Sequence, residues 1–238
     1  MLLENKKVLV TGASRGIGKA LASACREAGA YVIGTATVDC EVLRDNCNEV
    51  YEVDFYEENQ LQDFIHIVRM LEVDVLINNA GINKIDSFCD ICLDDFLKIQ
   101  QVNLQAPFLL CQAVIPNMKR KGWGRIVNLS SIWGKISKEY RASYSASKFG
   151  LDGMTLALST EHASDGILAN CIAPGFTDTE LTRNILGEEG VASLLDSIPI
   201  GRMASVEEIA GFAVWLSSNE NTYITGQNIA IDGGYSRA

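Results

Sequence analysis

The chain has 238 residues, of which 47% are hydrophobic, and its formal net charge is −10. This length suits one domain with a substantial core, and we expect a single domain over residues 1–238. The acidic balance argues against general binding to nucleic acid or to an anionic membrane surface. No apolar run is long enough to span a bilayer, and the first residues do not form a signal peptide. These features predict a cytoplasmic protein.

Seven cysteines are scattered along the chain, and we interpret them as reduced residues of the core or surface. Cys89 and Cys92 form a C-x-x-C pair, but no second cysteine pair and no neighbouring histidine completes a zinc site. We therefore expect no metal site.

Apolar, β-rich runs alternate with helical patterns along the chain. Strands are predicted at residues 7–12, 31–36, 49–55, 73–81, 124–131, 167–175 and 226–234. Helices are predicted at residues 18–29, 93–122, 143–163 and 205–218, the last with Ser205 and Glu208 as a capping box. The near-continuous apolar strands and their alternation with helices predict an α/β fold, a doubly wound parallel sheet with helices on both faces. Residues 177–199 interrupt this pattern after a strand's carboxyl end and are a candidate substrate lid.

A glycine-rich stretch, "TGASRGIG" at residues 11–18, joins the first strand to the first helix. We expect Gly12 to permit a tight turn, Gly16 to let the backbone approach a ligand, and Gly18 to let the helix pack close to the strand. Backbone N–H groups at a helix N-terminus can hold a pyrophosphate, so this position favours a dinucleotide site. A glycine-rich turn with packing duties alone is the alternative.

The end of the second strand bears on the choice of dinucleotide. It reads Thr35-Ala36-Thr37 and lacks the carboxylate that accepts the ribose hydroxyls of NAD. Arg15 in the glycine loop could reach a 2′-phosphate. Asp39 lies near the expected offset, but we interpret it as a cap of the short helix beginning near Glu41. The sequence therefore favours NADP(H) over NAD(H).

The stretch "YSASK" places Tyr144 and Lys148 four residues apart on one face of a helix. A nearby ammonium can lower a phenol's pKa and make the phenol a usable acid or base. The alternative is an ordinary surface pair.

These motifs, together with "NNAG" (residues 78–81), Asn103, Ser131 and "PGFTDT" (residues 174–179), resemble in order and spacing the short-chain dehydrogenase/reductase family. The similarity is greatest to its 3-oxoacyl-carrier-protein reductase branch. The resemblance implies a Rossmann-type sheet of seven strands in the order 3-2-1-4-5-6-7, a homotetramer, and hydride transfer between a carbonyl and a secondary alcohol.

The resemblance also implies residue roles. Tyr144 would be the proton donor or base, Lys148 would lower the phenol's pKa and hold the nicotinamide ribose, and Ser131 would bind the substrate oxygen. The implied catalytic residues are Asn103, Ser131, Tyr144 and Lys148. The implied or predicted cofactor contacts are Gly12, Ser14, Arg15, Gly16, Ile17, Gly18, Thr37, Asp54, Phe55, Asn79, Ala80, Gly81, Tyr144, Lys148, Pro174, Gly175, Thr177 and Thr179.

Asn103 has a second, physical interpretation. Pro107 has no N–H and cannot bond the carbonyl of Asn103, four residues earlier. The family's Asn at this position holds a water of a proton relay, and Pro107 would help to expose that acceptor. An ordinary kink is the alternative.

The expected partner is a small carbonyl or alcohol substrate. An acyl carrier protein is a further candidate, but Gly122 and Asp165 stand where carrier-protein reductases use arginines, and residues 119–121 form a basic cluster that could compensate or could simply be solvated. Polar residues 138–141 would suit a sugar, polyol or nucleotide-linked sugar. A catalytically silent dinucleotide sensor is the alternative outside enzymes.

Overall fold

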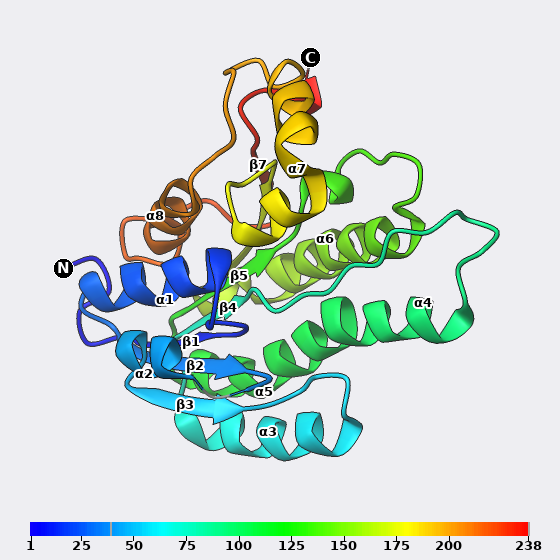
Figure 1. Ribbon diagram of the computed structural model, residues 1–238. Coiled ribbons are helices and arrows are strands. Elements are labelled where there is room, and N and C mark those ends of the chain that lie inside the picture. The colour runs from blue at the N-terminus through cyan, green and yellow to red at the C-terminus, as the bar shows by residue number, and fades with distance from the viewer. Residues whose placement is uncertain (39, 238) are drawn as a thin grey trace.

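One parallel sheet forms the centre of the molecule (Figure 1), a computed structural model that describes residues 1–38 and 40–237 without the side chains of 181, 184–186, 188, 189 and 192. Asp39, predicted to cap a helix, lies outside the described residues. The sheet has seven strands in the order β3-β2-β1-β4-β5-β6-β7, and all neighbours are parallel. The fold class and strand order expected from the sequence are therefore confirmed. The strands are β1 (Lys7–Val10), β2 (Tyr31–Ala36), β3 (Glu49–Glu52), β4 (Val75–Asn78), β5 (Gly124–Leu129), β6 (Ile167–Pro174) and β7 (Asn228–Ile231).

Helices cover both faces of this sheet. Helices α1 and α8 pack on one face, and α3, α5 and α6 pack on the other. Two helices, α3 and α7, lie where no element is predicted. The helices are α1 (Gly16–Glu27), α2 (Glu41–Asn46), α3 (Glu58–Leu71), α4 (Leu93–Gln100), α5 (Ala106–Lys121), α6 (Ala142–His162), α7 (Glu180–Leu195) and α8 (Val206–Leu216).

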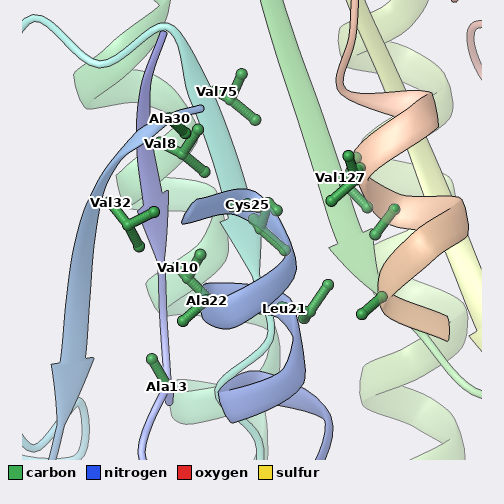
Figure 2. Close-up of a cluster of buried hydrophobic side chains, with 14 of the residues drawn as sticks. Val8, Val10, Ala13, Leu21, Ala22, Cys25, Ala30, Val32, Val75 and Val127 are labelled. Atoms are coloured by element: carbon green, nitrogen blue, oxygen red, sulfur yellow. The ribbon is translucent and has the colours of Figure 1, made fainter. Parts of the chain in front are cut away.

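The central strands β1 and β4 are almost entirely apolar because both of their faces are buried. Val8 and Val10 of β1 point to the core beneath α1, and Leu9 points to the opposite core with α3 and α5. Figure 2 shows Leu21 and Ala22 of α1 in the same cluster as Val8 and Val10 of β1. Burial of each such side chain contributes about 1.5–3 kcal/mol, so the sheet and its two helix layers stabilise one another.

Residues 93–122, predicted as one helix, fold as α4, a π-helical turn at Gln101–Gln105, and α5. The Ala106 N–H bonds the Gln101 carbonyl, five residues earlier. Pro107 follows without an N–H, so a regular α-helical ladder cannot continue through this point. The π turn therefore replaces the simple kink that the sequence left as an alternative.

The predicted capping box is confirmed, because Ser205 Oγ accepts the Glu208 N–H and the Glu208 carboxylate accepts the Ser205 N–H. The candidate lid contains α7, which is interrupted at Gly187 with φ 65° and ψ 177°. This segment begins just after β6, at the carboxyl edge of the sheet, where ligands bind in folds of this kind.

Candidate active site

The glycine loop has the geometry that a phosphate cradle needs. Gly12 and Gly16 have φ of 67° and 52°, a region that L-residues other than glycine rarely adopt. A Cβ on Gly12 would lie 3.0 Å from Ala80 Cα, and one on Gly18 would overlap the Gly12 carbonyl oxygen. The loop is therefore tightly packed against its neighbours at Gly12 and Gly18, while the Gly16 side remains open except for a Thr179 methyl 3.6 Å from the Cβ position.

Two threonines that sequence reasoning missed hold this loop in place. Thr11 Oγ1 accepts the backbone N–H groups of Asn79 and Ala80 at 2.9 and 3.0 Å, and the Asn79 amide donates back to the Thr11 and Gly12 carbonyls. Thr35 Oγ1 accepts the Gly12 N–H at 3.3 Å. Each threonine lies at or near the end of a buried strand. A polar residue in such an apolar run could have identified both positions from the sequence.

The remaining predicted contacts of the loop lie at the same edge. Arg15 is exposed at the N-cap of α1, and Ser14 and Ile17 are half-buried. Thr37 is exposed directly after Ala36, the last residue of β2. Hydrogen bonds from Gly12 and Ala13 to Thr35 join this strand end to the loop. No carboxylate belongs to β2, so the described end of this strand agrees with the predicted preference for a 2′-phosphate.

Asp54 and Phe55, predicted to flank the adenine, follow the end of β3. The Asp54 carboxylate accepts the Tyr56 N–H at 2.9 Å and so shapes the turn into α3. The Phe55 ring is 5% exposed and packs 6.2 Å from the Phe64 ring in the core. The Phe55 ring therefore belongs to the core, and the expectation that Asp54 and Phe55 flank an adenine stays a prediction.

The predicted catalytic side chains converge at the carboxyl end of β5. Lys148 Nζ lies 5.5 Å from the centroid of the Tyr144 ring, so both side chains of α6 point to one side. Lys148 is 4% exposed and donates to the Leu129 carbonyl at 2.7 Å, at the end of β5. Ser131, two residues beyond β5, accepts the Trp133 N–H at 3.2 Å. The hydroxyl hydrogen of Ser131 is therefore available for donation, and in the ligand-free protein Ser131 is hydrogen-bonded with Tyr144.

The electrostatics of this group differ from the expectation for the tyrosine. Burial raises the pKa of Tyr144, and a hydrogen bond to Ser131 and the charge of Arg141 oppose this rise without cancelling it. Burial lowers the pKa of Lys148 to about 8, with the Cys171 thiol acting in the opposite direction. In the ligand-free protein the net change in the phenol's pKa is upward, because removal of the phenolate from water outweighs the charge of Arg141. The effect of Lys148 on this pKa stays a prediction.

Asn103 lies beside this group in the π turn. Its Oδ1 accepts the Ile82 N–H at 2.8 Å, and its Nδ2 donates to the Ile82 carbonyl and to Ser147 Oγ. A Cβ on Gly81 would lie 3.4 Å from Asn103 Oδ1 and 3.7 Å from Lys148 Nζ. The tertiary structure thus brings Asn103, Gly81 and Lys148 together from three elements.

The "PGFTDT" segment completes the edge. Pro174 ends β6, and the Gly175 N–H bonds the Ile231 carbonyl at 2.9 Å. Thr177 forms an isolated bridge with Ala204. Thr179 caps α7 by accepting the Thr182 N–H at 3.2 Å, and its methyl faces Gly16, so the start of the candidate lid adjoins the glycine loop.

The basic cluster of residues 119–121 does not belong to this edge. It precedes β5, whereas Ser131 follows that strand, so the two lie at opposite ends of the sheet. Its ammonium and guanidinium groups are paired with acidic side chains: Lys119 with Asp165 at 3.0 Å, Arg120 with Glu72 at 3.4 Å and Lys121 with Asp74 at 2.7 Å. Within one chain, these paired residues do not support the idea that the cluster replaces the arginines that carrier-protein reductases have at the positions of Gly122 and Asp165.

Other kinds of site find no support among the described residues. Cys89 and Cys92 are exposed free thiols, and across residues 1–38 and 40–237 no three His, Cys, Asp or Glu side chains are grouped to hold a metal ion. In the same part of the chain, no helix combines the length and apolar character needed to cross a membrane.

Comparisons with known proteins agree with this geometry. A family model described as enoyl-(acyl carrier protein) reductase matches residues 12–236. The 3-oxoacyl-[acyl-carrier-protein] reductase of Pseudomonas aeruginosa is 38% identical over 245 residues, and that of Vibrio cholerae is 36% identical over 242 residues. Each match covers 98% of this chain and 98% of the relative.

Solved structures that are provisionally assigned as sugar-acid dehydrogenases are also similar. A provisionally assigned NAD(P)-dependent gluconate 5-dehydrogenase from Beutenbergia cavernae, with NADP bound at low occupancy, has a TM-score of 0.94 and 33% identity and covers 99% of this chain and 98% of that one. A provisionally assigned 2-deoxy-D-gluconate 3-dehydrogenase from Agrobacterium tumefaciens with bound NADP has a TM-score of 0.91 and 33% identity, covering 98% of this chain and 97% of that one.

Proposed function

Because the chain belongs to the short-chain dehydrogenase/reductase family, we propose that it is an NADP(H)-dependent oxidoreductase that interconverts a carbonyl and a secondary alcohol, with Tyr144 as the acid or base. The observation that carries this proposal is the convergence of Ser131, Tyr144 and Lys148 next to Gly81. We also propose that the protein is cytoplasmic and that residues 1–238 form a single domain.

The cradle at the glycine loop supports a dinucleotide. Left-handed backbone at Gly12 and Gly16 and the N-terminus of α1 suit a pyrophosphate. Arg15 and the carboxylate-free end of β2 suit a 2′-phosphate, and the relatives of known structure described above carry NADP. A nicotinamide cofactor, when bound, supplies or accepts the hydride of the reaction.

The contacts of the proposed cofactor site come from the carboxyl ends of several strands. Those that we assign to it are Gly12, Ser14, Arg15, Gly16, Ile17, Gly18, Thr37, Asp54, Phe55, Asn79, Ala80, Gly81, Tyr144, Lys148, Pro174, Gly175, Thr177 and Thr179.

The proton chemistry falls to three side chains. In reduction, Tyr144 Oη gives its proton to the substrate oxygen, and in oxidation it takes that proton back. The Ser131 hydroxyl donates a hydrogen bond to the same oxygen while charge develops on it. The raised pKa of Tyr144 keeps the phenol protonated, which favours the role of proton donor in the reducing direction.

Lys148 and Asn103 would restore the proton of Tyr144. A Lys148 pKa of about 8 lets this ammonium give up and regain a proton near neutral pH. The Asn103 carbonyl cannot receive an α-helical bond from Pro107, and the Asn103 side chain lies near Lys148 through Gly81. We assign this carbonyl to the water of a proton relay that leads from Lys148 to solvent.

The substrate is a small molecule in this proposal. The similarity to carrier-protein reductases suggests a 3-oxoacyl thioester, and the similarity to gluconate dehydrogenases suggests a sugar acid. A net charge of −10 and a basic cluster that is already paired favour a free substrate over one delivered by an acidic carrier protein.

A second copy of the chain is the expected partner. A groove of about 650 Å³ runs between α4, α5 and α6, and Leu97 and Phe108 on its rim are 53% and 45% exposed. Such apolar surface typically marks an interface. We therefore propose a homo-oligomer, with the homotetramer of the family as the expected state, and light scattering of the purified protein would measure it.

The central test is Tyr144→Phe. We expect turnover of a ketone with NADPH to fall at least about a thousandfold, because general acid catalysis is worth about 10²–10⁴-fold, while NADPH binding measured by fluorescence stays within a few-fold. Tyr223→Phe, at a tyrosine that is 94% exposed, is the matched control and should keep full activity. Equal activity of the wild type and Tyr144→Phe would refute the assigned role.

A further inference from the structure

Three aromatic rings from distant segments meet beside Ser131. The Trp133 ring lies 6.1 Å from the Phe176 ring and 6.2 Å from the Tyr235 ring, and Phe176 lies 5.2 Å from Tyr235. All three pairs have edge-to-face geometry, with interplanar angles of 81°, 87° and 81°. Such pairs stabilise one another beyond their burial, so the three rings form one packed unit, called here the aromatic wall.

The aromatic wall lies at the catalytic edge of the sheet. Trp133 follows β5, Phe176 follows β6 and Tyr235 follows β7, each within a few residues of the strand's carboxyl end. Trp133 also contacts the proposed catalytic group directly, because its backbone N–H donates to Ser131 Oγ at 3.2 Å. Any substrate oxygen held by the Ser131 hydroxyl therefore lies near the backbone of Trp133, the residue that carries the first ring of the wall.

The wall is closely but not completely packed, because a cavity of about 150 Å³ lined by Phe176, Ile231 and Asp232 among others adjoins it. Trp133 is 7% exposed, and Phe176 and Tyr235 are half-buried. The C-terminal turn that carries Tyr235 is fixed by Asp232, whose carboxylate accepts the backbone N–H groups of Gly234 and Ser236 at 3.0 and 2.8 Å. A well-packed group of this kind resists insertion of further atoms.

The same turn is backed by the end of the candidate lid. Gly233 has φ of 62°, and a Cβ there would lie 2.5 Å from Ile200 Cγ2 and 3.0 Å from Ile198 Cγ2. The Ile200 N–H bonds the Gly233 carbonyl at 3.2 Å. Figure 1 accordingly shows the C-terminal end of the chain beside α7. Ile198 and Ile200 thus support the turn that carries Tyr235.

We propose that Trp133, Phe176 and Tyr235 form the closed end of the substrate site, so that the substituent of the reacting carbon that faces Ser131 must be short. The inference rests on the function proposed above, because it takes Ser131 as the residue that binds the substrate oxygen. It names the substrate class as compact ketones and the corresponding secondary alcohols, including molecules of the size of a sugar acid. A 3-oxoacyl compound with a long tail does not fit against the wall.

The experiment compares a short and a long ketone under otherwise equal conditions. The kcat/KM for NADPH-dependent reduction is measured with ethyl 3-oxobutanoate and with ethyl 3-oxodecanoate. We expect the wild-type protein to prefer the short ester by at least about tenfold, because a pocket that cannot hold added methylenes discriminates by about 10–200-fold.

Variants then test whether the wall causes this preference. Trp133→Ala removes the ring but keeps the backbone N–H that bonds Ser131, and Tyr235→Ala removes a ring at the far side of the cluster. Each should raise the kcat/KM of the long ester relative to the short ester by about tenfold or more. Tyr235→Phe, which keeps the ring, should retain the wild-type ratio, and Tyr223→Ala serves as the surface control.

The outcomes separate the inference from the proposed function. A wild-type protein that reduces both esters equally well, or alanine variants that leave the ratio unchanged, would overturn the inference while the oxidoreductase function stands. If Trp133→Ala is inactive with both esters, the ratio of kcat/KM for the long and the short ester in Tyr235→Ala tests the inference instead. Absence of any reduction of the short ester by the wild type would overturn the proposed function, and the inference with it.

Discussion

Replacement of Lys148 by methionine tests the electrostatics of the site without any ligand. Lys148 is 4% exposed, and burial holds its pKa at about 8 instead of the ordinary 10.5. A change of this size corresponds to roughly 3 kcal/mol, because each tenfold change in proton affinity is worth about 1.4 kcal/mol. Lys148→Met keeps an unbranched apolar chain of similar length in the same space and removes the titration.

The sign follows from the protons bound in each state. Below about pH 8, Lys148 is charged in both the folded and the unfolded chain, so the penalty of the buried charge is fully present. Between pH of about 8 and 10.5 the unfolded chain keeps a proton that the folded chain has lost. The free energy of unfolding of the wild type should therefore rise with pH relative to that of Lys148→Met, by roughly 3 kcal/mol across this window.

The assay is urea unfolding, followed by circular dichroism, of the wild type and the variant at a series of pH values. Lys138→Met is the matched control, because its side chain is 45% exposed, and its difference from the wild type should stay flat. A constant difference between the wild type and Lys148→Met across the whole window would refute the reasoning, since it would mean that Lys148 titrates alike in the folded and unfolded chains.

Two further substitutions test the cofactor end of the site. Ala36→Asp places a carboxylate at the end of β2, next to Thr37. The ratio of kcat/KM for NADPH to kcat/KM for NADH should fall by about tenfold or more, because a carboxylate there accepts the ribose hydroxyls of NADH. An unchanged ratio would contradict the assigned position of the 2′-phosphate. Gly18→Ala drives a Cβ into the Gly12 carbonyl and to within 2.5 Å of Asn79 Nδ2, so we expect a loss of about 1–3 kcal/mol in stability by thermal unfolding, together with weaker NADPH binding. If this variant is as stable as the wild type, the glycine loop can shift to accommodate the added Cβ, and the prediction is wrong.

Features encoded within a few residues could be predicted from the sequence. The strands at residues 31–36 and 124–131 are apolar runs bounded by turns, and the structure has β2 and β5 there. The capping box at Ser205 and Glu208 depends on a spacing of three residues and is formed as predicted. The order of the strands, in contrast, was known from the family resemblance, because alternation of strands and helices does not by itself specify which strands are neighbours.

Prediction failed where the helical pattern lacked a local stop signal or where no motif marked a helix. The apolar periodicity of residues 93–122 concealed the π turn, since the missing N–H of Pro107 changes hydrogen bonding without changing the hydrophobic pattern. Helix α3, whose Phe64 packs against the Phe55 ring, was also missed, because no motif marked this helix.

The sequence by itself determined the alternating strands and helices, the left-handed turns of the glycine loop, and a helix face shared by Tyr144 and Lys148, because each depends on spacing along a short piece of chain. Only the tertiary structure decided what surrounds those groups. It raised the pKa of Tyr144, paired Lys119 with Asp165, and joined Trp133 to Tyr235 across more than a hundred residues. Desolvation and contacts between distant segments depend on the folded surroundings, and no local pattern encodes them.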